Sequence, residues 1–157
     1  MKYFVRRRLP PLDRLLLIES GSRRLLDRFV PHWIASHGRP AIMDLVTCYP
    51  GRPASLPPEA GTVYRVTEYP GAAGARRLRR ELLARGHGVA VVICSGEDIM
   101  TKWKLLLAAT LPVKVLVLNE NADYFWLDRS NLRTIRHFLL FRSGLTGSTA
   151  VRTLADL

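Results

Sequence analysis

Three short stretches of this chain consist almost wholly of branched apolar residues, and each of them runs into a small polar turn. They are Leu15–Ile18, Val89–Ile93 and Val113–Leu118. Successive side chains of a strand point to opposite faces of a sheet, so a stretch without polar alternation indicates a strand that is covered on both faces. Helical patterns connect these strands, and strands that alternate with helices predict a parallel sheet between two layers of helices.

The complete pattern predicts five strands and four helices in one domain. We expect the strands at residues 14–19, 41–47, 62–67, 89–94 and 113–118, and the helices from the serines at 20–22 to about 36 and over 74–85, 99–111 and 131–142. Pro31 lies inside the first helix, where we expect a kink or a break. Residues 124–127 suit either an edge strand or a packed loop.

Right-handed crossovers between these strands give the strand order 3-2-1-4-5. The expected fold is therefore a Rossmann-like, three-layer α/β/α sandwich around a mainly parallel five-stranded sheet. We expect it to span residues 13–143, between a basic N-terminal arm (1–12) and a C-terminal tail (144–157).

The predicted strand order reverses between the first and fourth strands, and open α/β sheets bind ligands in the crevice at such a point. The turns Glu19–Ser22 and Ser95–Asp98 would meet there, with Glu19 and Glu97 facing each other. Carboxylates in a cleft can act as general bases or hold sugar hydroxyls, so these two glutamates are the candidate catalytic residues. Acids that complement the dipole of a following helix explain them equally well.

A phosphate or a sugar could bind around the same turns. Backbone N–H groups at helix starts can hold a phosphate, and an arginine in the first helical turn could clamp it. The candidate ligand-binding residues are Ser20, Gly21, Ser22, Arg23, Ser95, Gly96, Asn119, Glu120 and Asn121. The alternative is that the serines cap helices and the glycines permit tight turns.

The string NENADYFW at residues 119–126 combines two amides, two acids and three consecutive aromatic residues. Such a string suits recognition of a sugar or a base by stacking and hydrogen bonding, or else an aromatic flap that packs on the core. The sequence has no GxGxxG, Walker A, GxSxG or clustered His/Cys pattern, so we expect no cofactor and no metal. His32 and His37 are expected to be exposed helix residues rather than ligands.

Lysine and arginine outnumber the acids by 24 to 13, which gives a formal net charge of +11. We therefore expect an anionic partner, either a phosphorylated small molecule or nucleotide sugar, or an anionic membrane surface that Arg6–Arg8 and the arginine-rich last helix would contact. Nucleic acid is the least favoured partner, because no known motif accompanies the charge.

The compartment follows from the cysteines and from hydropathy. Cys48 and Cys94 end strands that are not neighbours, which disfavours a disulfide and favours the reducing cytoplasm. No apolar segment is long enough to cross a bilayer, and the N-terminus has no signal-peptide pattern. We expect a cytoplasmic protein, with peripheral contact at the inner face of the membrane as an open alternative.

The succession of LLLIESGSRR, DLVTCYPG, VAVVICSGE, a helix and PVKVLVLNENADYF resembles the N-terminal half of GT-B-type glycosyltransferases, and in particular the heptosyltransferase-like group. The resemblance covers about residues 13–127. It implies a domain that binds a sugar or a nucleotide sugar in cell-envelope polysaccharide assembly. The family keeps a catalytic aspartate after the first turn, whereas this chain has Ser22, Arg23 and Arg24 there, and its nearest acid is Asp27.

The resemblance does not extend to the second, donor-binding half of such enzymes. We therefore expect that activity would need a partner chain or self-association. The alternative function is a non-enzymatic basic module that docks on anionic membrane lipid or on a protein partner.

Overall fold

A six-stranded, mostly parallel sheet forms the centre of the molecule, in the order β3-β2-β1-β4-β5-β6. The computed structural model describes residues 9–95, 97–133 and 135–137. The strands are β1 (Arg14–Glu19), β2 (Ile42–Thr47), β3 (Val63–Arg65), β4 (Val89–Cys94), β5 (Lys114–Asn119) and β6 (Tyr124–Trp126). The α/β, Rossmann-like fold is confirmed, whereas the prediction of only five strands is wrong.

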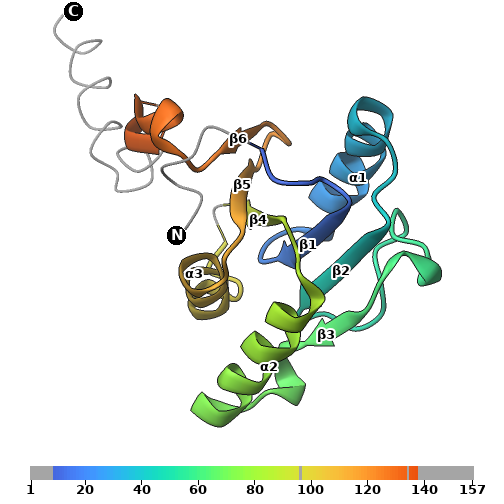
Figure 1. Cartoon of the computed structure of the whole chain (residues 1–157), viewed down its shortest axis with the longest axis vertical. Coiled ribbons are helices and arrows are strands. Elements are labelled where there is room, and N and C mark those ends of the chain that lie inside the picture. The colour runs from blue at the N-terminus through green and yellow to red at the C-terminus, as the bar shows by residue number, and fades with distance from the viewer. Residues whose placement is uncertain (1–8, 96, 134, 138–157) are drawn as a thin grey trace, which may run out of the picture.

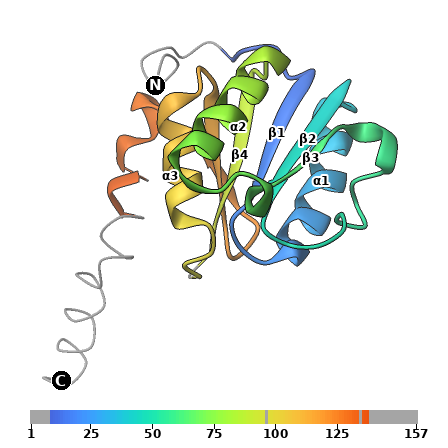
Figure 2. The ribbon, with the colours of Figure 1, turned by 90° about the horizontal axis from the view of Figure 1, so that it is seen from below.

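Helices cover both faces of this sheet, as Figures 1 and 2 show. Helix α1 (Arg23–His37) lies on one face, and α2 (Gly71–Arg85) and α3 (Thr101–Thr110) lie side by side on the other. This division follows from the strand order, because right-handed crossovers in opposite directions along a sheet place their helices on opposite faces.

The core is correspondingly split into two apolar layers. Leu15 and Leu17 of β1 pack against α1, whereas Leu16 and Ile18 pack on the α2–α3 side. All four side chains are almost fully buried, so the unbroken apolar run reports a strand covered on both faces. On the α1 side, Phe29 and the other buried residues of that helix complete the layer: Leu25, Leu26, Val30 and Trp33.

The sixth strand arises because the chain turns back on itself after β5. β6 pairs antiparallel with β5, with Val117 opposite Phe125. Lys114 Nζ lies 3.0 Å from a carboxylate oxygen of Asp128 and 5.2 Å from the centroid of the Trp126 ring, and both charged side chains are buried. A buried lysine needs such a partner, so this ion pair holds the returning strand against β5.

Several element boundaries differ from the predicted ones. The expected strand over 62–67 is shorter, because Val66–Glu68 form a 3₁₀ turn (η2) after β3. Helix α1 continues through Pro31 to His37, so the expectation of a break there is wrong. Helix α2 begins three residues before the predicted start.

A second 3₁₀ turn, η1 (Pro58–Ala60), precedes β3, and a third, η3 (Arg129–Asn131), follows β6. Of the predicted last helix, residues 132–133 and 135–137 are helical, and its remainder lies outside the described residues. The same is true of the Arg6–Arg8 cluster and of the tail at 144–157.

Candidate functional site

The first two polar turns meet directly at the carboxyl edge of the sheet. Ser20 Oγ donates a hydrogen bond to the carbonyl oxygen of Ile93 over 2.6 Å. A β-carbon added to Gly21 would lie 2.3 Å from Ser95 Oγ, so the turns are in contact with no room for a side chain. The two turns thus lie side by side as predicted, but Ser95 and Ile93 fill the space at Gly21 and leave no room for a ligand there.

The serines of the first turn contribute to the contact between the turns and not to capping of helix α1. Ser22 occupies the N-cap position of α1, yet its side chain makes no capping hydrogen bond. Ser20 is fully buried and is committed to β4 through Ile93. The alternative that serines cap the helix therefore fails for their side chains, and what they fix is the approach of β1 to β4.

Glu19 is buried and held by three donors. Its carboxylate accepts hydrogen bonds from Arg23 Nε at 2.7 Å and Arg23 Nη2 at 3.1 Å, and from the hydroxyl of Thr47. Its side chain is 0% exposed, and that of Arg23 is 30% exposed. A buried carboxylate needs this compensation, and Glu19 in turn sets the direction of the arginine.

Arg23 connects this ion pair to the surface. It donates from Nη1 to the carbonyl oxygen of Pro50 over 2.9 Å, and its guanidinium lies 5.4 Å from the centroid of the Tyr49 ring. The hydrogen bond to Glu19 raises the pKa of Arg23, so its positive charge is permanent. A fixed cation is thereby presented beside a tyrosine at the sheet edge.

Glu97 has the opposite environment, because it is exposed. Its nearest hydrogen-bond partner is the hydroxyl of Ser95, at 3.5 Å. Burial, followed by the charges of Cys48, Glu97 and Glu19, raises the pKa of the Tyr49 hydroxyl. Both candidate catalytic acids thus act electrostatically on Tyr49. The neighbouring Gly96, a predicted ligand-binding residue, lies outside the described residues.

The third turn is built around Asn119. Its side-chain oxygen accepts hydrogen bonds from the backbone N–H groups of Asn121 and Asp123, each at 3.0 Å. Ala122 has a positive φ of 64° and is strained into the left-handed region. Asn119 is therefore a turn-forming residue, and it leaves Glu120 and Asn121 exposed at the tip.

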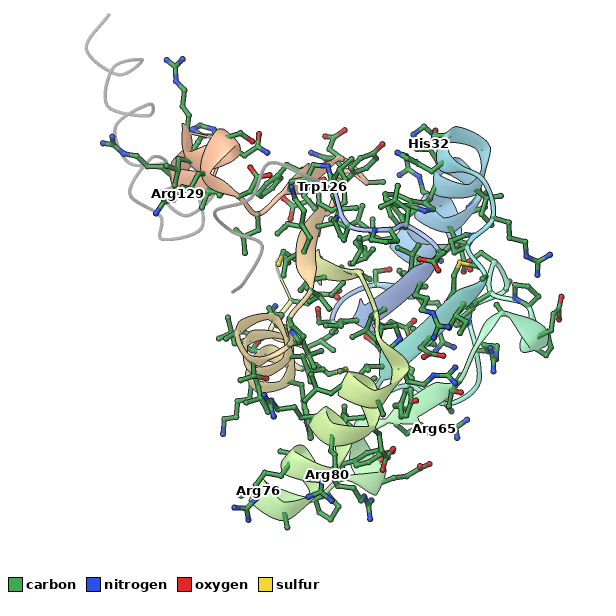
Figure 3. The ribbon with its side chains drawn as sticks, viewed as in Figure 1. His32, Arg65, Arg76, Arg80, Trp126 and Arg129 are labelled. Atoms are coloured by element: carbon green, nitrogen blue, oxygen red, sulfur yellow. The ribbon has the colours of Figure 1, made fainter. Side chains whose placement is uncertain are left out.

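A pocket of about 490 Å³ opens between this third turn and helix α1. Its lining residues are Arg28, Phe29, His32, Asn121, Ala122, Asp123 and Tyr124. The ring of Tyr124 packs edge-on against Phe29, with centroids 5.8 Å apart, and lies 6.3 Å from the ring of His32. In Figure 3, His32 lies on the side of α1 nearest to β6. The pocket combines an aromatic wall with polar groups on both rims.

Of the predicted ligand-binding residues that the structure describes, only Asn121 lines this pocket. Sequence reasoning missed Arg28 and His32, and it assigned His32 to an exposed helix surface, which is where it lies. Their spacing of four residues places both on one side of α1, but nothing in the sequence shows that the turn after β5 faces that side. Asp27, the acid nearest to the family's catalytic position, accepts the backbone N–H of Ser55 and anchors a loop.

A second cluster of charged side chains lies at the opposite, amino-terminal edge of the sheet. Asp44 of β2 is buried, and its carboxylate binds Arg85 at 2.8 and 3.0 Å, His87 at 2.8 Å and the N–H of Thr62 at 2.7 Å. Burial alone would raise the pKa of Asp44, but the hydrogen bonds from His87 and Arg85 hold it well below its ordinary range. This enclosed cluster ties β2 to the end of α2 and to the residues that precede β3 and β4, and has a structural role.

Within the described part of the chain, no three His, Cys, Asp or Glu residues are grouped as a metal site would require. No disulfide joins Cys48 and Cys94. None of the helices in the described ranges is long and apolar enough to cross a membrane.

Comparison of the chain with protein-family models, with curated proteins and with solved structures returned no match. The geometry of the site is therefore the basis for assigning a function.

Proposed function

We propose that this cytoplasmic domain binds a sugar carrying a phosphate or nucleotide, as one half of a GT-B-like glycosyltransferase in cell-envelope polysaccharide assembly. The observation that carries the proposal is the pocket between α1 and the turn after β5. Ligand sites of open α/β sheets lie outside the carboxyl ends of the strands, and this pocket is at that edge. Its volume falls in the range of about 300–1,000 Å³ that small-molecule sites occupy.

The lining residues suit the parts of such a ligand. The Tyr124 ring offers an apolar surface for the C–H groups of a sugar, and its packing against Phe29 makes it rigid. The exposed side chains of Asn121 and Asp123 supply an amide and a carboxylate for hydroxyl groups. Arg28, on the opposite rim, supplies a positive charge for phosphate.

The polar side chains of the pocket have spare bonding capacity. Among the described residues, no hydrogen bond or ion pair engages the side chains of Arg28, Asn121 or Asp123. Polar groups in a concavity that are not used for folding remain available to a ligand. This distinguishes the pocket from the Gly21–Ser95 contact, where the protein fills the available space.

The two candidate acids would then have different tasks. Neither acid lines the pocket. Glu97 is exposed and would accept a proton from a hydroxyl of a ligand that extends from the pocket to the first two turns, whereas Glu19 is bound to Arg23 and Thr47 and would act by holding Arg23. The second wall of the cleft would come from a partner chain or from self-association, as in the two-halved architecture of the resembling family.

Isothermal titration calorimetry with sugar phosphates and nucleoside-diphosphate sugars tests the proposal. We expect measurable binding that Arg28→Gln or the double change Asn121→Ala/Asp123→Ala weakens by roughly 10- to 100-fold, the effect of losing one or two hydrogen bonds to charged groups. The matched control is Arg24→Gln, which removes an equal charge from an exposed position of the same helix outside the pocket. Equal weakening by the control, or no binding of any such ligand, would contradict the proposal.

A further inference from the structure

Helices α2 and α3 form the most basic surface that the structure describes. Helix α2 carries five arginines against one acid, and α3 carries two lysines and no acid, so this layer holds +6 of the net charge of +11. The charged residues are Arg76, Arg77, Arg79, Arg80, Arg85 and Glu81 of α2, and Lys102 and Lys104 of α3. The two helices are neighbours (Figure 2). Arg79 Nη2 of α2 donates a hydrogen bond to the carbonyl oxygen of Thr110 of α3 over 3.3 Å.

Some of these cations are committed to the fold. Arg85 binds Asp44, and Arg77 donates to the carbonyl oxygen of Glu68 and lies 4.6 Å from the centroid of the Tyr69 ring. The exposed cations with no ion pair or hydrogen bond among the described residues are Arg76, Arg80 and Lys102. Figure 3 shows the first two on the side of α2 that faces away from the sheet. These three therefore define a basic outer face.

Large apolar side chains are exposed beside these cations. Leu105 of α3 is 64% exposed and Leu83 of α2 is 36% exposed. Only Leu107 of the ten residues in α3 is fully buried, although the helix is rich in leucine. A hollow of about 550 Å³ at the start of α3 adds Met100 and Trp103 next to Lys102. Exposed apolar groups that gather on one surface and are bordered by charged residues mark a site that binds a protein or a membrane.

We propose that this outer face of α2 and α3 docks on an anionic phospholipid membrane. Arg76, Arg80 and Lys102 would contact the phosphate-bearing head groups, and the two exposed leucines would enter the interface beneath them. Basic residues alternating with apolar ones on one surface are the pattern that lies in the interfacial plane of a membrane. Trp103 is the one aromatic residue of α2 and α3, and it is partly buried, so the face lacks the series of stacking platforms that binds single-stranded nucleic acid.

Helices α2 and α3 lie on the opposite side of the sheet from α1 (Figure 1), and α1 supplies one wall of the ligand pocket. A membrane bound at α2 and α3 would therefore leave the pocket open. The proposal stands independently of sugar binding, and each can fail while the other holds.

Co-sedimentation of the full chain with vesicles tests the docking surface. We expect binding to phosphatidylcholine vesicles that contain phosphatidylglycerol, little binding to pure phosphatidylcholine, and weakening as salt is added. Each basic residue near such a surface contributes about 1 kcal/mol, so the triple change Arg76→Gln/Arg80→Gln/Lys102→Gln should lower the partition coefficient on the order of 100-fold. Leu105→Ser should lower it several-fold and leave the salt dependence unchanged.

The matched control is Arg24→Gln/Arg39→Gln/Arg65→Gln, which removes the same charge from other surfaces. It should lower partitioning far less than the α2–α3 variant. Equal losses in the two triple variants would overturn the proposal. So would binding that survives the α2–α3 variant and disappears when Arg6–Arg8 are changed, or binding to an oligonucleotide in the absence of vesicle binding. Circular dichroism shows that each variant is folded before it is scored.

Discussion

The two edges of the sheet both carry acids and arginines, but they use them differently. At the amino edge, the carboxylate of Asp44 is enclosed and accepts four hydrogen bonds from Arg85, His87 and Thr62. At the carboxyl edge, the pocket presents Arg28 and Asp123 with no partner for their side chains among the described residues. The carboxyl edge also has a committed group, Glu19, which Arg23 and Thr47 hold. The difference therefore lies in the pocket, whose polar side chains are not used to hold the fold and, on the proposed function, bind the ligand.

The strongest test of this difference is Asp44→Asn. Removing one member of a buried ion pair leaves the other charges uncompensated, so we expect the free energy of unfolding to fall by about 3 kcal/mol. Urea denaturation followed by circular dichroism measures it. Asp13→Asn, an exposed acid just before β1, should change stability by less than about 0.5 kcal/mol. Ligand affinity per folded molecule should stay unchanged in both; a loss of affinity with intact stability in Asp44→Asn would make the amino edge functional.

The same cluster predicts a defined response to acid. The folded-state pKa of Asp44 lies below its unfolded value of about 3.9, so the stabilisation is fully present above that pH and is lost as the pH falls through the folded-state value. Denaturation curves recorded between about pH 6 and pH 2.5 should show the wild type losing more stability than Asp44→Asn. Parallel curves for the two proteins would show that Asp44 is not the acid-sensitive group.

The substitution Gly21→Ala tests the close contact between the first two turns, and we expect it to destabilise the fold. The added β-carbon would lie 2.6 Å from Ile93 Cγ2 as well as 2.3 Å from Ser95 Oγ, and overpacking of this kind costs about 1–3 kcal/mol. The pocket between α1 and the third turn should keep its affinity in the folded variant. Retained stability with abolished ligand binding would instead place the ligand at Gly21.

Ser22→Ala should have the smallest effect. An N-cap serine usually stabilises a helix by about 1 kcal/mol, but the side chain of Ser22 makes no capping hydrogen bond. We expect a change below about 0.5 kcal/mol in thermal or urea denaturation. A cost of a full kilocalorie per mole would show that the cap forms in solution and that this turn is arranged differently.

The central strands could be located in the sequence because unbroken apolar runs such as Leu15–Ile18 indicate burial on both faces of the sheet. The order of the first five strands then followed from right-handed crossovers. β6 could not be located in this way, because three partly buried aromatic residues suit a strand and a loop equally. The returning strand is held by the buried ion pair of Lys114 and Asp128, two residues that are far apart in the sequence and meet only in the fold.

The candidate site was predictable at the level of turns and not of side chains. The meeting of the turns at Gly21 and Ser95 follows from strand order alone. Arg23 and Thr47 occupy the carboxylate of Glu19 with hydrogen bonds. The sequence does not show this, because it depends on the register of β1 and β2, which pairs Glu19 with Thr47. The sequence does not identify Arg28 and His32 as pocket residues, because the pocket forms only where the turn after β5 lies against α1.

The central claim is that ligand chemistry resides in the pocket between α1 and the turn after β5. Amide chemical-shift mapping of the ¹⁵N-labelled chain during titration with a nucleoside-diphosphate sugar tests it most directly. The account predicts shifts that saturate and concentrate at residues 28–32 and 121–124, with the amides around Asp44 and His87 unmoved. Shifts confined to Gly21 and Ser95, or no saturable shift at 28–32 and 121–124, would contradict it.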